Sequence, residues 1–353
     1  MTASLKFVNV GIIGPGLVGR ALIKQLMEFG ASNGVRIAGI INSKSMLLIK
    51  GDDWESAVKD WPNNSETSNM QNFTAHMASQ AVPVMVDCTS SDAVAGQYPE
   101  WLSQKLSIVT PNKKGFSGDM KLYKTLSQAN QNTYVYHEAT VGAGLPIIST
   151  LKSLVRTGDK IVKIEGIFSG TMSFLFNTFS APNGAPESFS KCVGIAKDSG
   201  YTEPDPRDDL NGMDVARKVT ILGRVAGLDI SLDTLPVENV VPEALRSCQT
   251  SEEFMTKLPE FDEHFGKLNA EAAARGEVLR YVGTVDPSGK SCTALKAFPN
   301  THPFASLKGS DNIISFITER YPVPLIVQGA GAGADVTAAG IFSDILAISD
   351  RHN

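Results

Sequence analysis

Short apolar runs alternate with mixed or polar segments along the first part of the chain. Runs with the length and β-branched content of buried strands lie at residues 7–13, 35–41, 82–86 and 106–110. Residues 20–29 have the pattern of a helix, and the mixed segment 45–80 is expected to form helices and a loop beside the sheet. Strands that alternate with helices in this order predict an α/β domain built on a doubly wound parallel sheet.

The pattern changes near residue 150, where a second domain is expected to begin. Its strand-like runs are 163–168, 278–285, 291–298 and 313–318, and residues 229–275 are helical and linker-like. We therefore predict a first domain over 1–149 and an α+β domain over 150–324. A Gly/Ala-rich bend followed by a final helix at 336–348 predicts that residues 325–353 return to complete the first domain.

One helix of the second domain combines an apolar side with two charged residues. It is expected to begin near Leu210, after a proline-broken acidic turn at residues 203–206 that is followed by two further aspartates. Its apolar arc consists of Val215, Val219, Ile221, Leu222, Val225 and Ala226. Arg217 and Arg224 fall on the opposite side and are expected to face solvent, whereas Asp214 and Lys218 fall inside the arc.

The i,i+4 spacing of Asp214 and Lys218 allows two interpretations. An exposed ion pair at this spacing is common and contributes about 0.3–0.5 kcal/mol. A charge buried on an apolar side persists only if an opposite charge pairs with it or if it has a functional role. A lysine in such a position can serve as a proton donor. Because Glu203, Asp208 and Asp209 lie just upstream, the stretch could also supply carboxylates for a cationic substrate. It is a candidate active site, still without a reaction.

Gly14, Gly16 and Gly19 form a GxGxxG pattern between the first strand and the first helix. Such glycines allow a tight turn and a close approach of the backbone to a pyrophosphate, so a Rossmann-type NAD(P) site is expected. The alternative is a glycine-rich turn without a ligand. Lys44 follows the second strand, where NAD sites usually carry an acid, and therefore favours NADP(H) unless it is an ordinary loop lysine.

Three further residues follow strand ends, where ligands of doubly wound folds bind. Thr89 and Ser90 are candidates for cofactor contact, although one of these hydroxyls could equally cap a helix. Lys113 could reach the same crevice, but alone it is more typical of a solvated loop. Glu138 precedes a glycine-rich bend that could gather carbonyls around a hard cation, and the simpler interpretation is a hydrogen-bonded turn. His137 is interpreted as structural.

Composition excludes several classes of protein. The 353 residues are 42% hydrophobic and 20% charged, with a formal net charge of −5 and no basic run, which argues against nucleic acid as a partner. No apolar run is long enough for a membrane span, and the N-terminus lacks a signal-peptide pattern. The four cysteines lie far apart and outside metal-binding patterns, as expected for reduced thiols in a cytoplasmic protein.

Together these motifs resemble the homoserine dehydrogenases. The matching segments are GPGLVG at 14–19, TPNKKGFS at 110–117, YHEATVGAGLPI at 136–147, SGTMS at 169–173, GYTEPDPRDDLNGMDVARKVTILGR at 200–224, HPFASLKGSDN at 302–312 and QGAGAGADVTAAG at 328–340. The 200–224 stretch is the most specific of them. The chain resembles the short fungal form, so neither an aspartokinase before the first motif nor an ACT domain after residue 353 is expected.

The resemblance implies NAD(P)H-dependent, reversible reduction of L-aspartate-4-semialdehyde to L-homoserine, on the route to threonine, methionine and isoleucine. By resemblance, Lys218 is the general acid/base and Lys113 orients the substrate. The implied substrate-binding residues are Glu203, Asp214, Asp209, Tyr201 and Thr171. The implied cofactor contacts are Gly14, Leu17, Val18, Thr89, Lys113, Gly200 and Gly333, to which the residue pattern adds Gly16, Gly19, Lys44 and Ser90. Glu138 and the main-chain oxygens of Val141, Ala143 and Leu145 match the family's sodium site, which is expected to bind sodium or another monovalent cation. The second domain is expected to form a homodimer.

Other functions stay open at this point. One is an NADP-dependent oxidoreductase that acts on a different semialdehyde or an imine, and another is a non-catalytic NADP(H)-binding sensor. An aldehyde-oxidising acyl-enzyme route is disfavoured, because Cys88 and Cys292 are interpreted as strand residues rather than nucleophiles.

Overall fold

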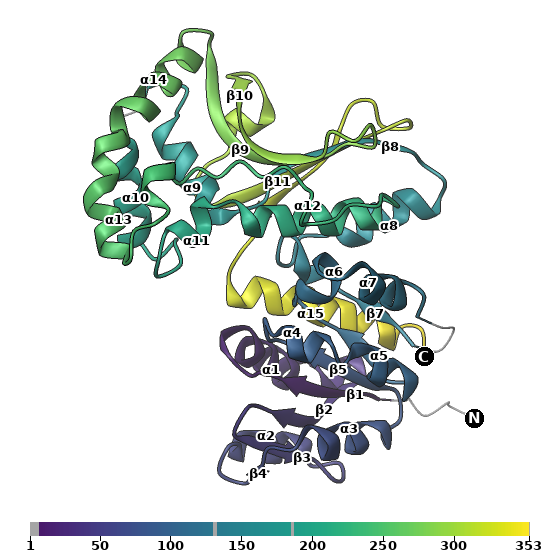
Figure 1. Ribbon diagram of the computed structural model, residues 1–353. Helices are drawn as coiled ribbons and strands as arrows, with labels where there is room; N and C mark the ends of the chain where they lie inside the picture. Colours follow the sequence, from purple (N-terminus) through teal and green to yellow (C-terminus); the bar gives the residue numbers. More distant parts are fainter. Residues whose placement is uncertain (1–6, 130–132, 185–186, 353) are drawn as a thin grey trace. The chain divides into compact units, whose positions relative to one another are not determined.

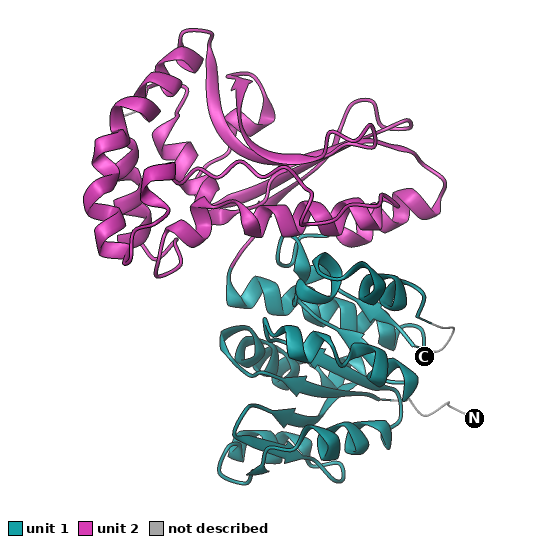
Figure 2. Ribbon diagram, in the orientation of Figure 1, with its two compact units in different colours: residues 1–146, 333–353 teal, residues 147–332 magenta. Residues whose placement is uncertain are grey.

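The computed structural model describes residues 7–129, 133–184 and 187–352, and the chain divides into two compact units (Figure 2). Unit 1 consists of residues 1–146 and 333–353, and unit 2 of residues 147–332. The predicted return to the first domain at residue 325 comes too early. Residues Leu325–Ala330 form strand β12, which pairs antiparallel with β11 (Asp311–Thr318) in unit 2. This pairing keeps the chain in unit 2 until residue 332.

Unit 1 is built on a seven-stranded sheet of order β4-β3-β2-β1-β5-β6-β7 (Figure 1). Its parallel strands are β1 (Val8–Ile13), β2 (Val35–Ile41), β5 (Pro83–Asp87), β6 (Ser107–Val109) and β7 (Val135–Tyr136). The predicted parallel sheet is thereby confirmed. Two antiparallel edge strands, β3 (Ser45–Leu48) and β4 (Glu66–Thr67), occupy part of the segment that was expected to contain only helices and a loop. Both are too short to show a period in the sequence.

The predicted return of the last helix to the first domain is confirmed. The helices of unit 1 are α1 (Leu17–Phe29), α2 (Trp54–Asp60), α3 (Met70–Ala78), α4 (Asp92–Ala95), α5 (Tyr98–Ser103), α6 (Lys114–Ser117), α7 (Met120–Ser127) and α15 (Ala334–Ser349), with 3₁₀ turns η1 (Ala31–Asn33) and η2 (Glu138–Thr140). Leu22 and Leu26 of α1 share one buried core with Ile341 and Ile345 of α15. This core joins the two ends of the described chain in unit 1.

Unit 2 contains a five-stranded antiparallel sheet of order β10-β9-β8-β11-β12. Its remaining strands are β8 (Ile161–Ile167), β9 (Glu277–Val285) and β10 (Cys292–Pro299). Its helices are α8 (Ile148–Arg156), α9 (Gly170–Phe179), α10 (Phe189–Asp198), α11 (Arg207–Leu210), α12 (Met213–Val225), α13 (Ser251–Lys257) and α14 (Asp262–Ala273), with 3₁₀ turns η3 (Glu243–Leu245), η4 (Leu258–Phe261) and η5 (Pro303–Ser306). Helices α8 and α12 lie along one face of the sheet (Figure 1).

Helix α12 is buried on more sides than the sequence pattern indicated. Arg224 is only 4% exposed and donates from Nε to the Ile230 carbonyl at 3.0 Å, so the expectation that it faces solvent is wrong. A Cβ atom at Gly283 of β9 would lie 2.5 Å from the Val219 side chain. Glycine at this position therefore lets α12 pack directly on the sheet.

Candidate active site

The glycine pattern of unit 1 forms a tight turn between β1 and α1. Gly14 has a φ of 76° and donates from its N–H to the Ile41 carbonyl at 2.9 Å, which joins the turn to the end of β2. A side chain at Gly14 would overlap the Thr89 side chain, and a Cβ at Gly19 would lie 2.8 Å from the Gly14 carbonyl oxygen. The turn therefore requires glycine at both positions.

Helix α1 begins beside this turn without a side-chain cap. Its N-cap residue is Gly16, where an added Cβ would meet no atom within 4 Å. Leu17 is exposed and Val18 is half-buried. The first N–H groups of a helix carry partial positive charge and are suited to a phosphate. This arrangement can hold the pyrophosphate of a dinucleotide.

Asp87, at the end of β5, connects two loops of the predicted cofactor crevice. Its carboxylate is fully buried and accepts hydrogen bonds from the Tyr98 hydroxyl (2.6 Å), Asn112 Nδ2 (2.9 Å) and the Thr89 N–H (2.8 Å). Burial and the Asp87 charge raise the pKa of Tyr98 well above its ordinary value, so its hydroxyl stays a donor. No sequence motif assigned a role to Asp87. An acidic residue at the end of an apolar strand was the available signal.

The loop hydroxyls have roles that the sequence left open. Ser91 accepts a hydrogen bond from the Val94 N–H at 3.3 Å and caps α4. Thr89 instead accepts from the Ser91 N–H at 3.1 Å, and Ser90 is exposed. The helix-cap alternative for Thr89 and Ser90 is therefore wrong.

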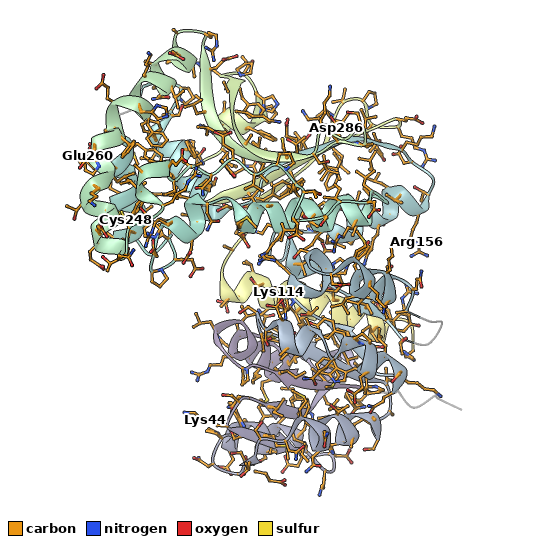
Figure 3. All side chains as sticks on the ribbon, in the orientation of Figure 1. Lys44, Lys114, Arg156, Cys248, Glu260 and Asp286 are labelled. Carbon is orange, nitrogen blue, oxygen red and sulfur yellow. The ribbon has the colours of Figure 1, made fainter. Side chains whose placement is uncertain are left out.

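The two lysines of unit 1 that were predicted to be site residues differ in their surroundings. Lys113 is half-buried and occupies the N-cap position of α6. Lys44 lies exposed in the loop between β2 and β3 (Figure 3), where Asn42 Oδ1 accepts from the backbone N–H of Lys44 at 2.7 Å. Because Gly14 bonds to the Ile41 carbonyl, the Lys44 loop begins next to the glycine turn.

In unit 2, Lys218 is buried while its partner is not. The Lys218 side chain is 9% exposed, and its Nζ lies 2.8 Å from Asp214 Oδ2, whose side chain is 47% exposed. The same Nζ donates to the Phe168 carbonyl at 2.7 Å. The arc thus predicted the inward position of Lys218, but it was wrong about Asp214, which lies at the edge of the buried region. The Lys218 ammonium therefore lies between the Phe168 carbonyl and a carboxylate that is partly exposed to solvent.

The Asp209 carboxylate lies close enough to Glu203 and Asp214 for their charges to affect it. Asp209 Oδ1 accepts from the Thr171 hydroxyl at 2.8 Å, and its Oδ2 accepts from the Glu203 N–H at 2.8 Å. Burial, followed by the charges of Glu203 and Asp214, raises the pKa of Asp209, whereas the two hydrogen bonds lower it. Carboxylates close enough to affect one another in this way favour a cation. The exposed Tyr201 ring stacks on Phe174 at a centroid distance of 4.4 Å, directly after the Gly200 turn (φ 73°).

The Glu138 segment has the donor set of a hard cation site. Glu138 is buried, and its N–H donates to Asp344 Oδ2 of α15 at 2.8 Å. Positive φ angles at Gly142 (78°) and Ala143 (54°) curl the chain that carries the Val141, Ala143 and Leu145 carbonyls. Carboxylate and carbonyl oxygens together suit a cation such as sodium. His137 is buried and stacks on Phe116 at 4.0 Å, in keeping with its structural interpretation.

Two family models match the chain. The one described as homoserine dehydrogenase matches residues 146–346, and the one described as homoserine dehydrogenase, NAD binding domain, matches residues 14–138. The chain belongs to the homoserine dehydrogenase family. The resemblance inferred from the sequence motifs is thereby confirmed, as is the assignment to the NAD(P)-dependent oxidoreductases.

Relatives of this family are similar along the whole chain. The homoserine dehydrogenase of Saccharomyces cerevisiae is 45% identical, with 99% of both chains covered, and that of Schizosaccharomyces pombe is 46% identical, with 99% and 98% covered. The chloroplastic bifunctional aspartokinase/homoserine dehydrogenase 1 of Zea mays is 50% identical over 96% of this chain, which spans 38% of that relative's length.

Solved structures share the fold. A Candida auris protein of unknown function is 46% identical, with a TM-score of 0.93 over 98% of this chain and 99% of its own. A hyperthermophilic archaeal homoserine dehydrogenase, solved in complex with NADPH, is 23% identical with a TM-score of 0.73, and 98% of both chains is covered. At that identity the second likeness concerns the fold alone.

Proposed function

We propose that this chain catalyses the reversible NAD(P)H-dependent reduction of L-aspartate-4-semialdehyde to L-homoserine. The observation that carries the proposal is the buried Lys218 ammonium, fixed by Asp214 and the Phe168 carbonyl in the unit that also holds the acidic turn. The experiment is to follow NADPH absorbance with aspartate semialdehyde and then with other semialdehydes and imines. Absence of turnover with aspartate semialdehyde, or faster turnover with another aldehyde, would reject this substrate.

The residues of unit 2 fit the chemistry of aldehyde reduction. When hydride from the nicotinamide reaches the aldehyde carbon, negative charge develops on the oxygen and a proton must be supplied. Lys218 provides this proton, and such general acid catalysis contributes about 10²–10⁴-fold. Lys113 is proposed, on family grounds, to orient the substrate. An acyl-enzyme route stays disfavoured, because burial raises the pKa of the Cys88 thiol. The sequence had suggested that Cys88 lies within a strand, but it comes directly after β5.

The carboxylates of the acidic turn are proposed to bind the substrate ammonium. We expect Glu203→Ala to raise the KM for aspartate semialdehyde about tenfold or more, with a smaller effect on kcat, because a charge-assisted contact is lost. Glu260→Ala is the matched control, since Glu260 is an exposed carboxylate of η4 in the same unit. Steady-state kinetics measure both. An unchanged KM in the Glu203 variant, or an equal rise in the control, would contradict the binding role.

NADP(H) is the proposed cofactor, supported by the exposed Lys44 beside the end of β2. We expect Lys44→Glu to raise the KM for NADPH about tenfold relative to that for NADH, because the new carboxylate repels the 2′-phosphate. Lys50→Glu makes the same charge change beyond β3 and should alter neither value. Equal effects of Lys44→Glu on the two cofactors would remove Lys44 from cofactor selection.

A sodium ion held by Glu138 and the carbonyls of Val141, Ala143 and Leu145 is proposed on the donor set described above. No cluster of three or more His, Cys, Asp or Glu side chains suited to a metal occurs in the described ranges, so backbone oxygens would supply most ligands. The test compares the Tm in sodium chloride with that in choline chloride of equal concentration. An identical Tm in the two salts would count against a bound sodium ion.

A homodimer formed through unit 2 is also proposed. Large exposed apolar side chains occur at one end of its sheet: Val162 in β8, Tyr321 and Val323 between β11 and β12, and Ile326 in β12. Sedimentation of the protein as a monomer at micromolar concentration would reject the dimer.

A cytoplasmic location is supported by the four free cysteines, and a fluorescent fusion would test it. In the described part of the chain, no helix combines the length and apolar character of a bilayer span.

A further inference from the structure

The Phe168 carbonyl, which holds Lys218, accepts a second hydrogen bond from a residue that the site described above does not include. Asn312 Nδ2 donates to it at 3.0 Å, while Lys218 Nζ donates at 2.7 Å. Asn312 belongs to β11 and has no exposed surface. Its neighbour Ile313 pairs with Ile167, the residue before Phe168. The Asn312 amide and the Lys218 ammonium are therefore within two hydrogen-bond lengths of each other.

The other half of this amide is unsatisfied. Within the described residues, Asn312 Oδ1 is buried and has no hydrogen-bond partner. A buried polar atom without a partner costs about 1–3 kcal/mol. Turning the amide over would place Oδ1 against the Phe168 carbonyl oxygen, so the donor contact fixes the orientation. An apolar side chain of similar size would avoid this cost, which makes a purely structural reason for asparagine weak.

We propose that Asn312 is a positioning residue for Lys218. Asn312 donates to one lone pair of the Phe168 carbonyl oxygen and so holds that carbonyl group in place. The other lone pair then points in a fixed direction, and Lys218 Nζ donates to it. The ammonium is then held at one position instead of moving with Asp214, which is half exposed. Gly331 leaves room for the amide, because a Cβ there would overlap Asn312 Nδ2. This inference rests on the proposed role of Lys218 as the proton donor.

The test compares Asn312→Leu and Asn312→Asp with the wild-type enzyme. Both variants lose the donor, and the leucine also removes the unsatisfied oxygen. We expect each to lower kcat at least about tenfold, with the KM for aspartate semialdehyde within about threefold, because the change affects alignment in the transition state. The Tm of Asn312→Leu should not fall, because the buried oxygen is gone. Slower turnover without lost stability is not expected of a merely structural side chain.

Asn177→Leu is the matched control. Asn177 Nδ2 donates to the Gly309 carbonyl at 3.0 Å, and its Oδ1 also has no partner within the described residues. This variant should keep kcat within about twofold of wild type. Wild-type kcat in Asn312→Leu, or an equal loss of kcat in Asn177→Leu, would overturn the proposal. The wild-type enzyme and a Lys218 variant are assayed alongside. No turnover by the wild type, or normal turnover without Lys218, would mean that the proposed function fails, whereas normal turnover of Asn312→Leu alone would mean that only the Asn312 proposal fails.

Discussion

Lys218→Met is expected to lower kcat at least about 10²-fold while the NADPH dissociation constant stays within about twofold of wild type. Methionine keeps most of the apolar stem, which is buried in α12, and removes the amino group that is proposed to donate the proton. The predicted cofactor contacts lie in unit 1, apart from Gly200 in unit 2, and Lys218 is not among them, so NADPH binding should not depend on this side chain. Steady-state kinetics and a fluorescence titration with NADPH measure the two quantities.

Lys257→Met is the control that separates catalysis from the loss of an ion pair. Lys257 and Glu253 also form an i,i+4 pair, at 2.7 Å, but the Lys257 side chain is 48% exposed. This variant should leave kcat and Tm nearly unchanged, because exposed pairs contribute little. Wild-type turnover in Lys218→Met would remove Lys218 from the mechanism, whatever the control shows.

The hydrophobic pattern was sufficient for the main elements of the fold. The run at 35–41 is β2 itself, and the strands predicted at 278–285 and 291–298 differ from β9 and β10 by one residue at each displaced end. Buried strands of this length need a continuous or alternating apolar run, which a single sequence displays directly. The edge strands β3 and β4 depend on pairing with β2 and with each other, and local sequence does not reveal such pairing.

Long-range partners explain where the pattern failed. A helical wheel places Arg224 on the polar side, because the wheel does not contain the Ile230 carbonyl that accepts its hydrogen bond. Arg280 of β9 is similarly buried, with its guanidinium donating to the Phe304 and Phe176 carbonyls, and burial lowers its pKa to about 10. Such charges remain inside because backbone oxygens, brought close only by the fold, satisfy them.

The residues of the candidate site also fall into those that local sequence reveals and those that depend on long-range contacts. Glycine spacing and the i,i+4 pair identified the turn at Gly14 and the inward Lys218, since both depend on local geometry. Asp87 and Asn312 act on residues of separate loops or strands, Asp87 on Thr89 and Asn112, and Asn312 on Phe168. Spacing along the chain carries no signal for contacts of that kind, so the sequence could not assign them.

Asp87→Asn is expected to lower the free energy of unfolding by about 2–4 kcal/mol and to raise the NADPH dissociation constant at least about tenfold. Both carboxylate oxygens accept from donors: Oδ1 from the Thr89 N–H, and Oδ2 from Tyr98 and Asn112. Whichever way the new amide turns, its NH₂ group faces an N–H or O–H donor. The Thr89 loop or the Asn112 loop must then move, and both carry predicted cofactor contacts. Thermal unfolding and an NADPH titration measure these effects.

Tyr98→Phe isolates one of the three contacts and is the natural control. Asp87 then keeps Asn112 Nδ2 and the Thr89 N–H, so we expect a loss of about 1 kcal/mol and an NADPH dissociation constant within about threefold of wild type. A destabilised Asp87→Asn variant that binds NADPH normally would show that Asp87 only stabilises unit 1. The opposite result is weak NADPH binding by Asp87→Asn, at a temperature where this variant remains folded, together with normal binding by Tyr98→Phe. This result would place the Thr89 and Asn112 loops in the cofactor site, since only Asp87→Asn displaces them.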